Sequence, residues 1–358
     1  MGGQFLFTFC VHERIVVKEE VAMNITGTWL ITGVTGFVGG LLTRHLMAQP
    51  EYLEGAVHIL GLVRDEDKAK RIFEGADRRN LHFIEADLCD GSAIAEIEEP
   101  LDFVVHCAAA TASSYMISNP VETADGIVLG TRNILELARE KNVKGMVHIS
   151  SMEVYGSVKD IGRPRTEEEL GDISLTSPRS SYPLGKRMAE LYCHTFWKEY
   201  GVPVKVARLA QTFGIGVRPE DNRVYMQFAK AAMEERDIVL KTRGRSFGNY
   251  CCSEDAVSAV LLLLEKGENG ETYNVVNEVN TMCIYEMAEL VANKMAGGRI
   301  KVRVESEDMK KTGYAPDTEL RLSGEKLRAL GWKPTKSLVE MYKDIIDTMS
   351  TEVTLHMG

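Results

Sequence analysis

Three kinds of feature are missing from this sequence, and each absence excludes a class of protein. No apolar run approaches the roughly 20 residues that span a bilayer, and the apolar stretch at 4–11 has neither a basic segment before it nor a small-residue cleavage site after it. Leu6 also stands where a myristoylation signal requires Ser or Thr. Internal repeats and low-complexity segments are absent. We therefore expect neither a membrane protein nor a repeat protein.

Paired cysteines and excess positive charge are also lacking. The seven cysteines are odd in number and include no Cys-x-x-Cys pair. We therefore expect reduced, buried thiols, no bound metal and a cytoplasmic protein. The formal net charge of −10 repels phosphate backbones and anionic lipids. This leaves a small molecule as the expected partner, with no nucleic acid and no membrane.

The composition that remains, 44% hydrophobic and 26% charged over 358 residues, is that of a globular protein with one large domain or two interlocked ones. Apolar segments alternate with helical patterns up to Arg208. The expected strands are 28–31, 57–63, 81–84, 103–107, 145–149 and 204–207, and the expected helices are 38–48, one starting at 65–67, 121–141 and 182–200. The alternation predicts an α/β fold, a Rossmann-type doubly wound parallel sheet.

After Arg208 the rhythm changes to helices at 224–235, 254–265, 285–293 and 338–349 with short strands between them. We interpret this part as a smaller, interleaved α+β region. The expected organisation is an N-terminal extension at 1–23, an NAD(P)-binding domain at 24–208 and a substrate-binding region at 209–358. The irregular stretch 156–180 is long enough to be a functional loop such as a lid.

The glycine motif Gly33-x-x-Gly36-x-x-Gly39 lies at the first strand-to-helix turn. Glycines permit the tight turn and the close approach of the backbone to a pyrophosphate, and the helix N-terminus stabilises its charge. The second strand ends at Val63, where an NAD-preferring site usually has an acid for the ribose 2′-hydroxyl. Arg64 follows and could meet a 2′-phosphate or simply be solvated. The cofactor is thus NAD or NADP, with a lean to NADP.

Tyr182-x-x-x-Lys186 lies at the start of a predicted helix, so both side chains share one face. A tyrosine is a poor proton acceptor at neutral pH unless a nearby ammonium lowers its pKa. Ser151, at the end of the fifth strand, can help to hold a substrate oxygen. The three residues together predict hydride chemistry assisted by proton transfer.

In chain order these residues belong to a longer set of motifs. The set is Thr32-Gly33-x-x-Gly36-Phe37-x-Gly39, Asp87-Leu88, His106-x-Ala108-Ala109, Gly130-Thr131, Ser150-Ser151-Met152-Glu153-Val154-Tyr155-Gly156 and Tyr182-x-x-x-Lys186. Over residues 27–350 it resembles the extended short-chain dehydrogenase/reductases, and among them the NAD-dependent nucleotide-sugar epimerases, dehydratases and decarboxylases.

The resemblance implies a role for each matching residue. Ser151, Tyr182 and Lys186 are the implied catalytic residues. The implied cofactor-binding residues are Gly33, Gly36, Phe37, Val38, Gly39, Asp87, Leu88, Ala108, Ala109, Tyr182, Lys186 and Leu209, joined by Arg64. The implied substrate-binding residues are Gln211 and Arg223. The resemblance also implies a homodimer formed through the helices at 121–141 and 182–200.

The sequence departs from the family pattern at several positions. Gly248-Asn249-Tyr250 replaces a stretch in which many members have a diphosphate-binding Arg, so Arg243 or Arg245 is the candidate substitute. Ile127 replaces a common Asn. Met152 replaces the Asp that the 4,6-dehydratases carry as an acid.

Glu153 remains as a candidate base for the C5 proton of a 4-keto sugar, projecting beside Ser151 if the strand end is extended. The alternative is a carboxylate that only orients the following loop. Three functions stay open. The first is a nucleotide-sugar epimerase, decarboxylase or dehydratase acting through a transient 4-keto sugar. The others are an NADP-dependent reductase of a sugar or sugar phosphate, supported by Arg64, and a dinucleotide sensor without enzymatic activity.

Overall fold

The computed structural model describes residues 25–159, 161–305 and 318–357, so the expected extension at 1–23 lies outside the described residues. The chain forms two compact units. Unit 1 contains the described residues up to Val154, together with Ile173–Arg208 and Val257–Tyr273. Unit 2 contains Tyr155–Asp172, Leu209–Ala256 and the described residues from Asn274 onward.

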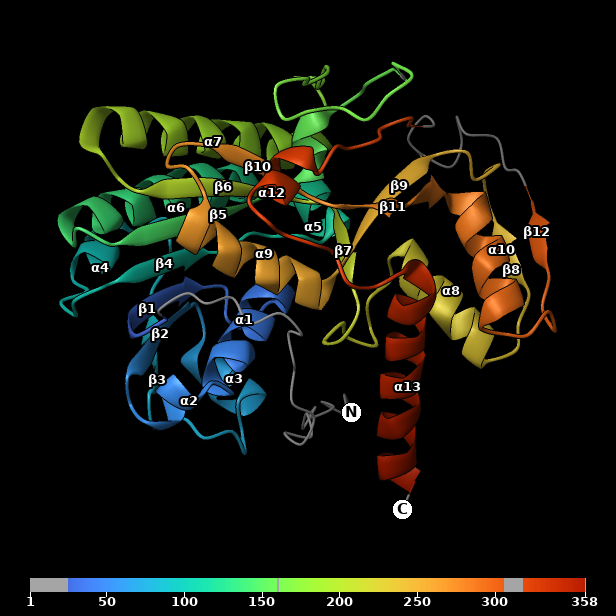
Figure 1. The fold of residues 1–358 in the computed structure, drawn as a ribbon, viewed down its shortest axis with the longest axis horizontal. Helices are drawn as coiled ribbons and strands as arrows, with labels where there is room; N and C mark the ends of the chain where they lie inside the picture. The colour runs from blue at the N-terminus through green and yellow to red at the C-terminus, as the bar shows by residue number, and fades with distance from the viewer. Residues whose placement is uncertain (1–24, 160, 306–317, 358) are drawn as a thin grey trace. The chain divides into compact units, whose positions relative to one another are not determined.

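Unit 1 is built on a seven-stranded sheet with the order β10-β6-β5-β4-β1-β2-β3 (Figure 1). The strands are β1 (Gly27–Thr32), β2 (Val57–Val63), β3 (Leu81–Glu85), β4 (Phe103–His106), β5 (Gly145–Ser151), β6 (Val204–Leu209) and β10 (Thr272–Val275). The pairs β1–β2, β1–β4, β2–β3 and β4–β5 are parallel. The strand order reverses at β1 and β4, so a crevice is expected outside their carboxyl ends.

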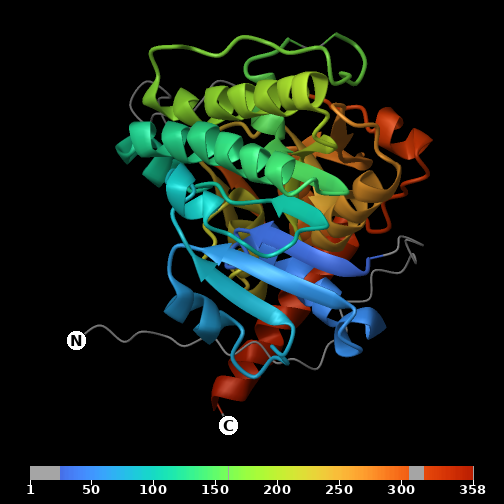
Figure 2. The same cartoon turned by 90° about the vertical axis from the view of Figure 1, so that its left-hand side faces the viewer.

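Helices cover both faces of this sheet. One face carries α4 (Gly91–Ala95), α6 (Pro120–Glu140) and α7 (Ser181–Tyr200), and Figure 2 shows α6 and α7 side by side along it. Side chains of these helices pack with alternate residues of β4, β5 and β6 into a dry core that includes Ile134, Phe196, Val104 and Met146. The other face carries α1 (Phe37–Met47), α3 (Glu66–Ile72) and α9 (Ser253–Lys266), with short α2 (Pro50–Leu53) at its edge. The predicted doubly wound parallel fold is confirmed.

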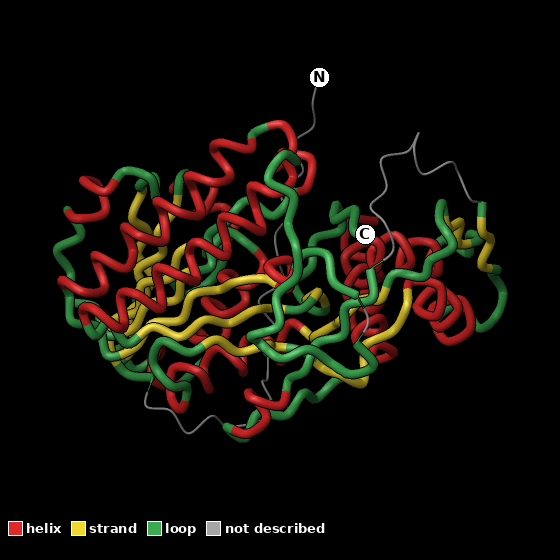
Figure 3. The backbone as a smooth tube through the Cα atoms, turned by 90° about the horizontal axis from the view of Figure 1, so that it is seen from above, coloured by secondary structure: helices red, strands yellow, loops and turns green. Residues whose placement is uncertain are grey.

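Unit 2 combines two small sheets with helices. Its sheets are β7 (Gln211–Phe213), β9 (Phe247–Cys252) and β11 (Asn277–Cys283), and β8 (Ile238–Leu240) with β12 (Val302–Val304). Its helices are α8 (Val224–Met233), α10 (Ile284–Lys294), α12 (Glu325–Ala329) and α13 (Leu338–Met357). Figure 3 separates these helices from the strands by colour. The centre is aromatic: Phe213 stacks on Tyr225 with ring centroids 4.4 Å apart and also contacts Tyr250 and Tyr342.

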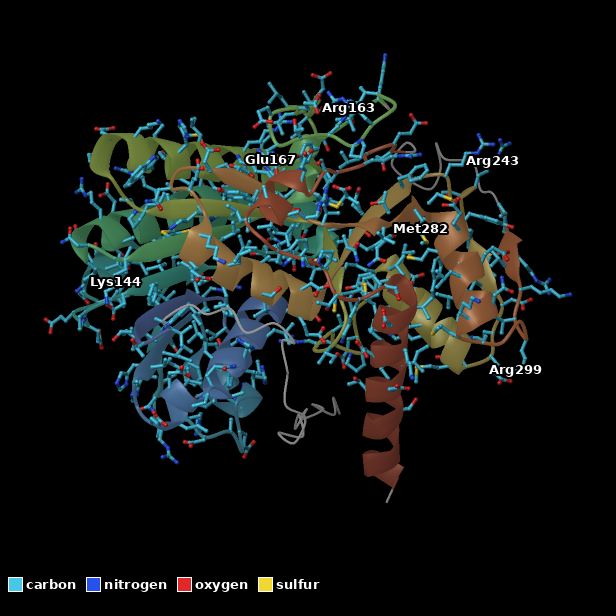
Figure 4. The ribbon with its side chains drawn as sticks, in the orientation of Figure 1. Lys144, Arg163, Glu167, Arg243, Met282 and Arg299 are labelled. Atoms are coloured by element: carbon cyan, nitrogen blue, oxygen red, sulfur yellow. The ribbon has the colours of Figure 1, made fainter. Side chains whose placement is uncertain are left out.

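Two segments belong to the other unit than the expected boundaries 24–208 and 209–358 would give. Residues 257–273 return to unit 1, because β10 extends its sheet beyond β6. Residues 155–172 join unit 2, where the Asn274 amide N–H donates to Glu167 and the Tyr155 hydroxyl donates to the Asn274 side chain. Figure 4 labels Glu167 and Arg163 in this segment. Within the stretch 156–180 that was expected as a lid, Glu167 is buried and accepts one of these hydrogen bonds, whereas most of the described residues around it are exposed or half-buried.

Two smaller observations concern the cysteines and the helices. Of the six cysteines in the described residues, Cys193, Cys251 and Cys252 are buried, but Cys107 and Cys283 are half-buried and Cys89 is exposed, so burial of the thiols is only partial. Within the described ranges, no helix is both long and apolar enough to cross a membrane.

A buried ion pair joins α7 to the neighbouring strands. Arg208, on β6, donates from Nε and Nη2 to both carboxylate oxygens of Glu190, at 2.7–3.2 Å, and Ser150 of β5 donates to the same carboxylate. Both side chains of the pair are more than 90% buried. Charges removed from water in this way require each other, because a lone one would remain desolvated without compensation.

We predict that Glu190→Leu lowers the free energy of unfolding by about 3–5 kcal/mol, because it leaves Arg208 buried and unpaired. The double variant Glu190→Leu/Arg208→Leu should recover most of that loss. Urea denaturation of the wild type, both single variants and the double variant gives the comparison. A double variant as unstable as the sum of the singles would contradict this account of the pair.

Candidate active site

The glycine turn after β1 is tightly packed against its surroundings. Gly33 has φ +74°, and a Cβ placed on it would lie 3.0 Å from the Cα and N of Ala108. A Cβ on Gly39 would lie 2.5 Å from the carbonyl oxygen of Gly33. Glycine is thus required at both positions, for a left-handed backbone in the first and for close packing of the helix onto the turn in the second.

The N-terminus of α1 that follows this turn is suited to an anion. Its N-cap is Gly36, which provides no side-chain hydrogen bond, and its first turn carries no acidic residue. The first amide N–H groups of a helix have no partner within the helix, and the helix dipole favours negative charge there. Phe37, Val38 and Gly39 supply these groups. The turn and the helix start therefore fit the pyrophosphate of a dinucleotide.

A buried chain of polar side chains connects the end of β1 to the end of β4 and to α6. Thr32, the last residue of β1, accepts a hydrogen bond from the backbone N–H of Ala108 at 3.0 Å and pairs with His106 Nδ1 at 2.8 Å. His106 Nε2 lies 3.2 Å from the hydroxyl of Thr131 on α6. Burial lowers the pKa of His106 to about 3, so the imidazole stays neutral. The chain holds Ala108 and the half-buried Ala109 beside the glycine turn.

The residues expected near the adenosine lie at the ends of β2 and β3. Arg64 directly follows β2, is exposed and forms no ion pair within the part of the chain that the structure describes. The two neighbouring carboxylates accept hydrogen bonds from backbone N–H groups of α3. Asp65 caps the helix by accepting from Lys68 N, and Glu85 accepts from Glu66 N. Asp87 accepts from the backbone N–H of Cys89, and Leu88 beside it packs against Gly130 of α6.

Tyr182 and Lys186 lie one helical turn apart on α7 and are both buried. Lys186 donates from Nζ to the backbone carbonyl of Ile149 at 2.6 Å, two residues before Ser151 at the end of β5. Arg187 provides a second tie by donating from Nε to the carbonyl of Val154 at 2.8 Å. These contacts fix the start of α7 against the strand end that carries Ser151, as the three-residue prediction requires.

The surroundings of Tyr182 are mostly apolar. It packs in a cluster with Met116, Ile127 and Ala189, with Ala109 against the cluster. Ile127 thus places an apolar side chain at the position where the sequence departs from a common Asn. Burial also lowers the pKa of Lys186 to about 8. The ammonium therefore still carries its charge at neutral pH and can stabilise a nearby phenolate.

The prediction that the strand continues in an extended conformation to Glu153 is wrong. Residues Met152–Tyr155 form a 3₁₀ helix, η1, because the chain turns directly after β5, where the Ser151 hydroxyl accepts from Glu153 N at 3.2 Å. The Glu153 carboxylate is paired with Arg179, whose Nη2 lies 2.7–2.8 Å from its two oxygens. Arg179 belongs to a second 3₁₀ helix, η2 (Pro178–Ser180), which leads directly into α7.

The expected substrate residues occupy different places along the chain. Leu209 is the buried last residue of β6, and Gln211 is exposed on β7 of unit 2. Arg223, the N-cap of α8, pairs with Asp221 and lies over the ring of Tyr225. Arg245 is exposed in the loop before β9, as is Arg243, which Figure 4 labels. The structure leaves the roles of these residues as predictions.

The glycine turn before α1, and the attachment of the helix that carries Tyr182 and Lys186 to the strand that ends in Ser151, fit an enzyme of the short-chain dehydrogenase/reductase class. Residues 29–276 match the NAD dependent epimerase/dehydratase family. The chain belongs to this family.

Relatives of several activities match along most of the chain. The dTDP-D-glucose 4,6-dehydratase of Bos taurus is 26% identical over 88% of this chain and 88% of its own. The UDP-glucuronic acid decarboxylase 1 of Xenopus tropicalis is 28% identical over 87% of this chain and 69% of its own. The fold is similar to that of the UDP-glucose 4-epimerase of Thermotoga maritima, solved with UDP-glucose, with a TM-score of 0.76 and 22% identity over 91% of this chain and 100% of that one.

Sequence reasoning missed three groups that support the site. These are the Thr32–His106–Thr131 chain, the Ser150–Glu190–Arg208 group and the pair between Glu153 and Arg179. The spacing of Glu190, four residues after Lys186, was a usable signal, because it places the carboxylate on the same face of α7. Arg179 gave no such signal, since it lies in a stretch without periodicity.

We predict that Lys186→Met abolishes turnover and yet raises the free energy of unfolding at pH 7 by about 1–3 kcal/mol, because it removes a desolvated charge. The folded-state pKa of about 8 is below the ordinary 10.5, so the unfolded chain binds more protons between these values. The stability of the wild type should therefore rise relative to the variant as the pH increases from 8 to 10.5. Urea denaturation at pH 7, 9 and 10.5 measures the difference, and a constant difference would contradict the assignment.

Proposed function

We propose that this enzyme is a nucleotide-sugar epimerase, decarboxylase or dehydratase that acts through a transient 4-keto sugar. The observation that carries the proposal is the attachment of α7 to the end of β5, which sets Tyr182 and Lys186 beside Ser151 in a chain of the NAD dependent epimerase/dehydratase family. The nucleotide-sugar activities in the names of its relatives support the substrate class.

Each residue of the site has a distinct task in this proposal. The glycine turn and the first amides of α1 hold the pyrophosphate. When bound, the nicotinamide cofactor supplies a hydride acceptor and donor. Tyr182 takes the proton of the sugar C4 hydroxyl and later returns it, while the Lys186 ammonium stabilises the phenolate. Ser151 orients the C4 oxygen by hydrogen bonding.

The side chain at position 152 limits the choice among the three reactions. A dehydratase needs an acid for the C6 hydroxyl as well as a base for the C5 proton, and Met152 provides no acid. Glu153 is the candidate base, and its pairing with Arg179 equally supports a purely positioning role. Epimerisation or decarboxylation therefore fits the described residues more simply than a standard 4,6-dehydration.

Arg64 is the observation that favours a second candidate, an NADP-dependent reductase of a sugar or sugar phosphate. Its exposed guanidinium follows the strand that normally carries the ribose-binding acid, and the nearby Asp65 and Glu85 are held by backbone N–H groups of α3. These features support NADP as the finer identity of the cofactor.

A homodimer is part of the proposal. Helices α6 and α7 lie side by side on the outside of unit 1. They expose Val121, Leu129, Met188 and Leu191, each more than a third accessible. Large apolar side chains gathered on adjacent helices support self-association, and a second copy of the chain offers a complementary apolar surface.

To test the main function, the full chain is denatured after purification and any retained nucleotide is identified by mass spectrometry. We expect NAD or NADP to be retained, because an enzyme that recycles its cofactor within one turnover need not release it. The native enzyme is then incubated in D₂O with UDP-glucose, UDP-glucuronate or dTDP-glucose. We expect one of these to be converted, and Tyr182→Phe to lower kcat by about 10²–10⁴-fold.

Deuterium in the product reports on Glu153. With UDP-glucose or dTDP-glucose as the substrate, carbon-bound deuterium that is present with the wild type and absent with Glu153→Gln would assign the base role to Glu153, whereas its absence with the wild type leaves a positioning role. UDP-glucuronate is not used for this readout, because loss of its carboxyl group as CO₂ leaves an enolate that takes a solvent proton at C5 in any case. Cofactor that exchanges every turnover, with net oxidation or reduction of the sugar, would instead favour the reductase.

We predict that Arg64→Asp shifts the cofactor preference from NADP towards NAD by at least tenfold in the ratio of the two Kd values. A carboxylate repels a 2′-phosphate and can accept from a 2′-hydroxyl. Isothermal titration with both dinucleotides gives the ratio. An unchanged ratio would mean that Arg64 is a solvated residue without influence on the cofactor.

A further inference from the structure

An ion pair stands next to the proton-transferring tyrosine. Arg179 lies three residues before Tyr182, so its side chain reaches the same side of the α7 start. Its guanidinium carbon is 5.8 Å from the centroid of the Tyr182 ring, within the range of a cation–π contact. Its Nη2 is paired with Glu153, and its Nη1 is buried without an acceptor among the described residues.

Apolar packing around Tyr182 makes the pKa of this tyrosine sensitive to the charge of Arg179. Met116, Ile127 and Ala189 surround Tyr182 with apolar atoms, and such a setting disfavours a phenolate. The nearby cations that favour the phenolate include Lys186 and the guanidinium of Arg179. Glu153 partly cancels the second of these, because its carboxylate lies within 2.8 Å of the same guanidinium.

We propose that the pair between Glu153 and Arg179 sets the pKa of Tyr182, with Arg179 acting as a positioning residue and Glu153 as its counter-charge. The consequence for turnover rests on the proposed function, in which Tyr182 exchanges a proton with the sugar, but the pKa itself does not. In this arrangement Arg179 favours the phenolate and Glu153 limits that effect. The pH at which Tyr182 becomes a proton acceptor thus depends on both residues.

The other charged groups around Tyr182 do not change this logic. The elements around the start of α7 also carry other titratable side chains, which include Lys186, Arg187 and Glu190 of α7, His106 of β4, Cys107 after it, His148 of β5, Tyr115 of α5, and Glu122, Asp125 and Arg132 of α6. Burial keeps His106 and His148 neutral by lowering their pKa values, and it raises the pKa of Cys107 to about 12. Burial lowers the pKa of Lys186 to about 8, and this residue is present in every variant used below.

The test measures the Tyr182 pKa directly in the full-length enzyme saturated with NAD. The twelve tyrosines are labelled with ¹³C at Cζ, and the Tyr182 resonance is assigned as the one missing from Tyr182→Phe. We expect Glu153→Gln to lower the Tyr182 pKa and Arg179→Met to raise it, each by about half to one unit, as one charge some 6–8 Å away in a partly hydrated site would do. The double variant should return close to the wild-type value.

Two controls separate this effect from general disturbance. Arg179→Lys keeps the charge and should shift the pKa much less than Arg179→Met. Lys144→Met breaks another ion pair, with Asp102, at the opposite end of β5, and should leave the Tyr182 pKa unchanged (Figure 4). A seven-residue strand is about 20 Å long, so the Lys144 charge is distant and exposed.

Three outcomes would overturn the proposal. They are single variants that leave the pKa unmoved, single variants that shift it in the same direction, and a Lys144→Met shift as large as that of Arg179→Met. Because the readout needs no sugar, it stays informative even if none of the tested nucleotide sugars is a substrate. If a substrate is converted, the pH at which kcat rises should move with the measured pKa in each variant.

Discussion

The attachment of the start of α7 to the end of β5 is the constraint on which the site depends. The buried Lys186 ammonium forms this attachment by donating a hydrogen bond to one backbone carbonyl of β5. One turn further along α7, the Glu190 carboxylate accepts from Arg208 of β6 and from Ser150 of β5. Both contacts carry a desolvation cost in free energy, because they bury charged groups away from solvent. The gain is a fixed spacing between three functional groups that come from a strand end and a helix start.

The arrangement also explains why the supporting residues are polar while the packing around them is apolar. His106, Thr32 and Thr131 form a neutral hydrogen-bonded chain that links β4, β1 and α6, so they position backbone without adding charge. Charged side chains support the site in two places, next to Tyr182, where Arg179 lies over the ring, and further along α7, where Glu190 pairs with Arg208.

Much of the fold was predictable because the strands of unit 1 are short apolar runs separated by helices with clear periodicity. The strand at 57–63 has the predicted bounds, and the helix at 182–200 begins one residue earlier than expected. The glycine turn was predictable because only glycine satisfies it. The 3₁₀ helix after Ser151 was not predictable, because its four residues do not differ in composition from a strand end. The Glu153–Arg179 pair joins segments 26 residues apart through irregular chain, and the exchange of 155–172 and 257–273 depends on long-range pairing that local patterns do not encode.

That exchange has a consequence for how the protein is made. The chain passes between the two units five times, so neither unit exists as a continuous stretch that can be cut out. A nascent chain that has emerged only as far as Arg208 holds six of the seven strands of the large sheet, and β6 is then its edge until β10 is synthesised. An unpaired edge of this kind is open to pairing with other chains. The protein therefore has a window during synthesis in which its largest sheet is incomplete, and truncation or a stalled ribosome within that window would expose it to aggregation.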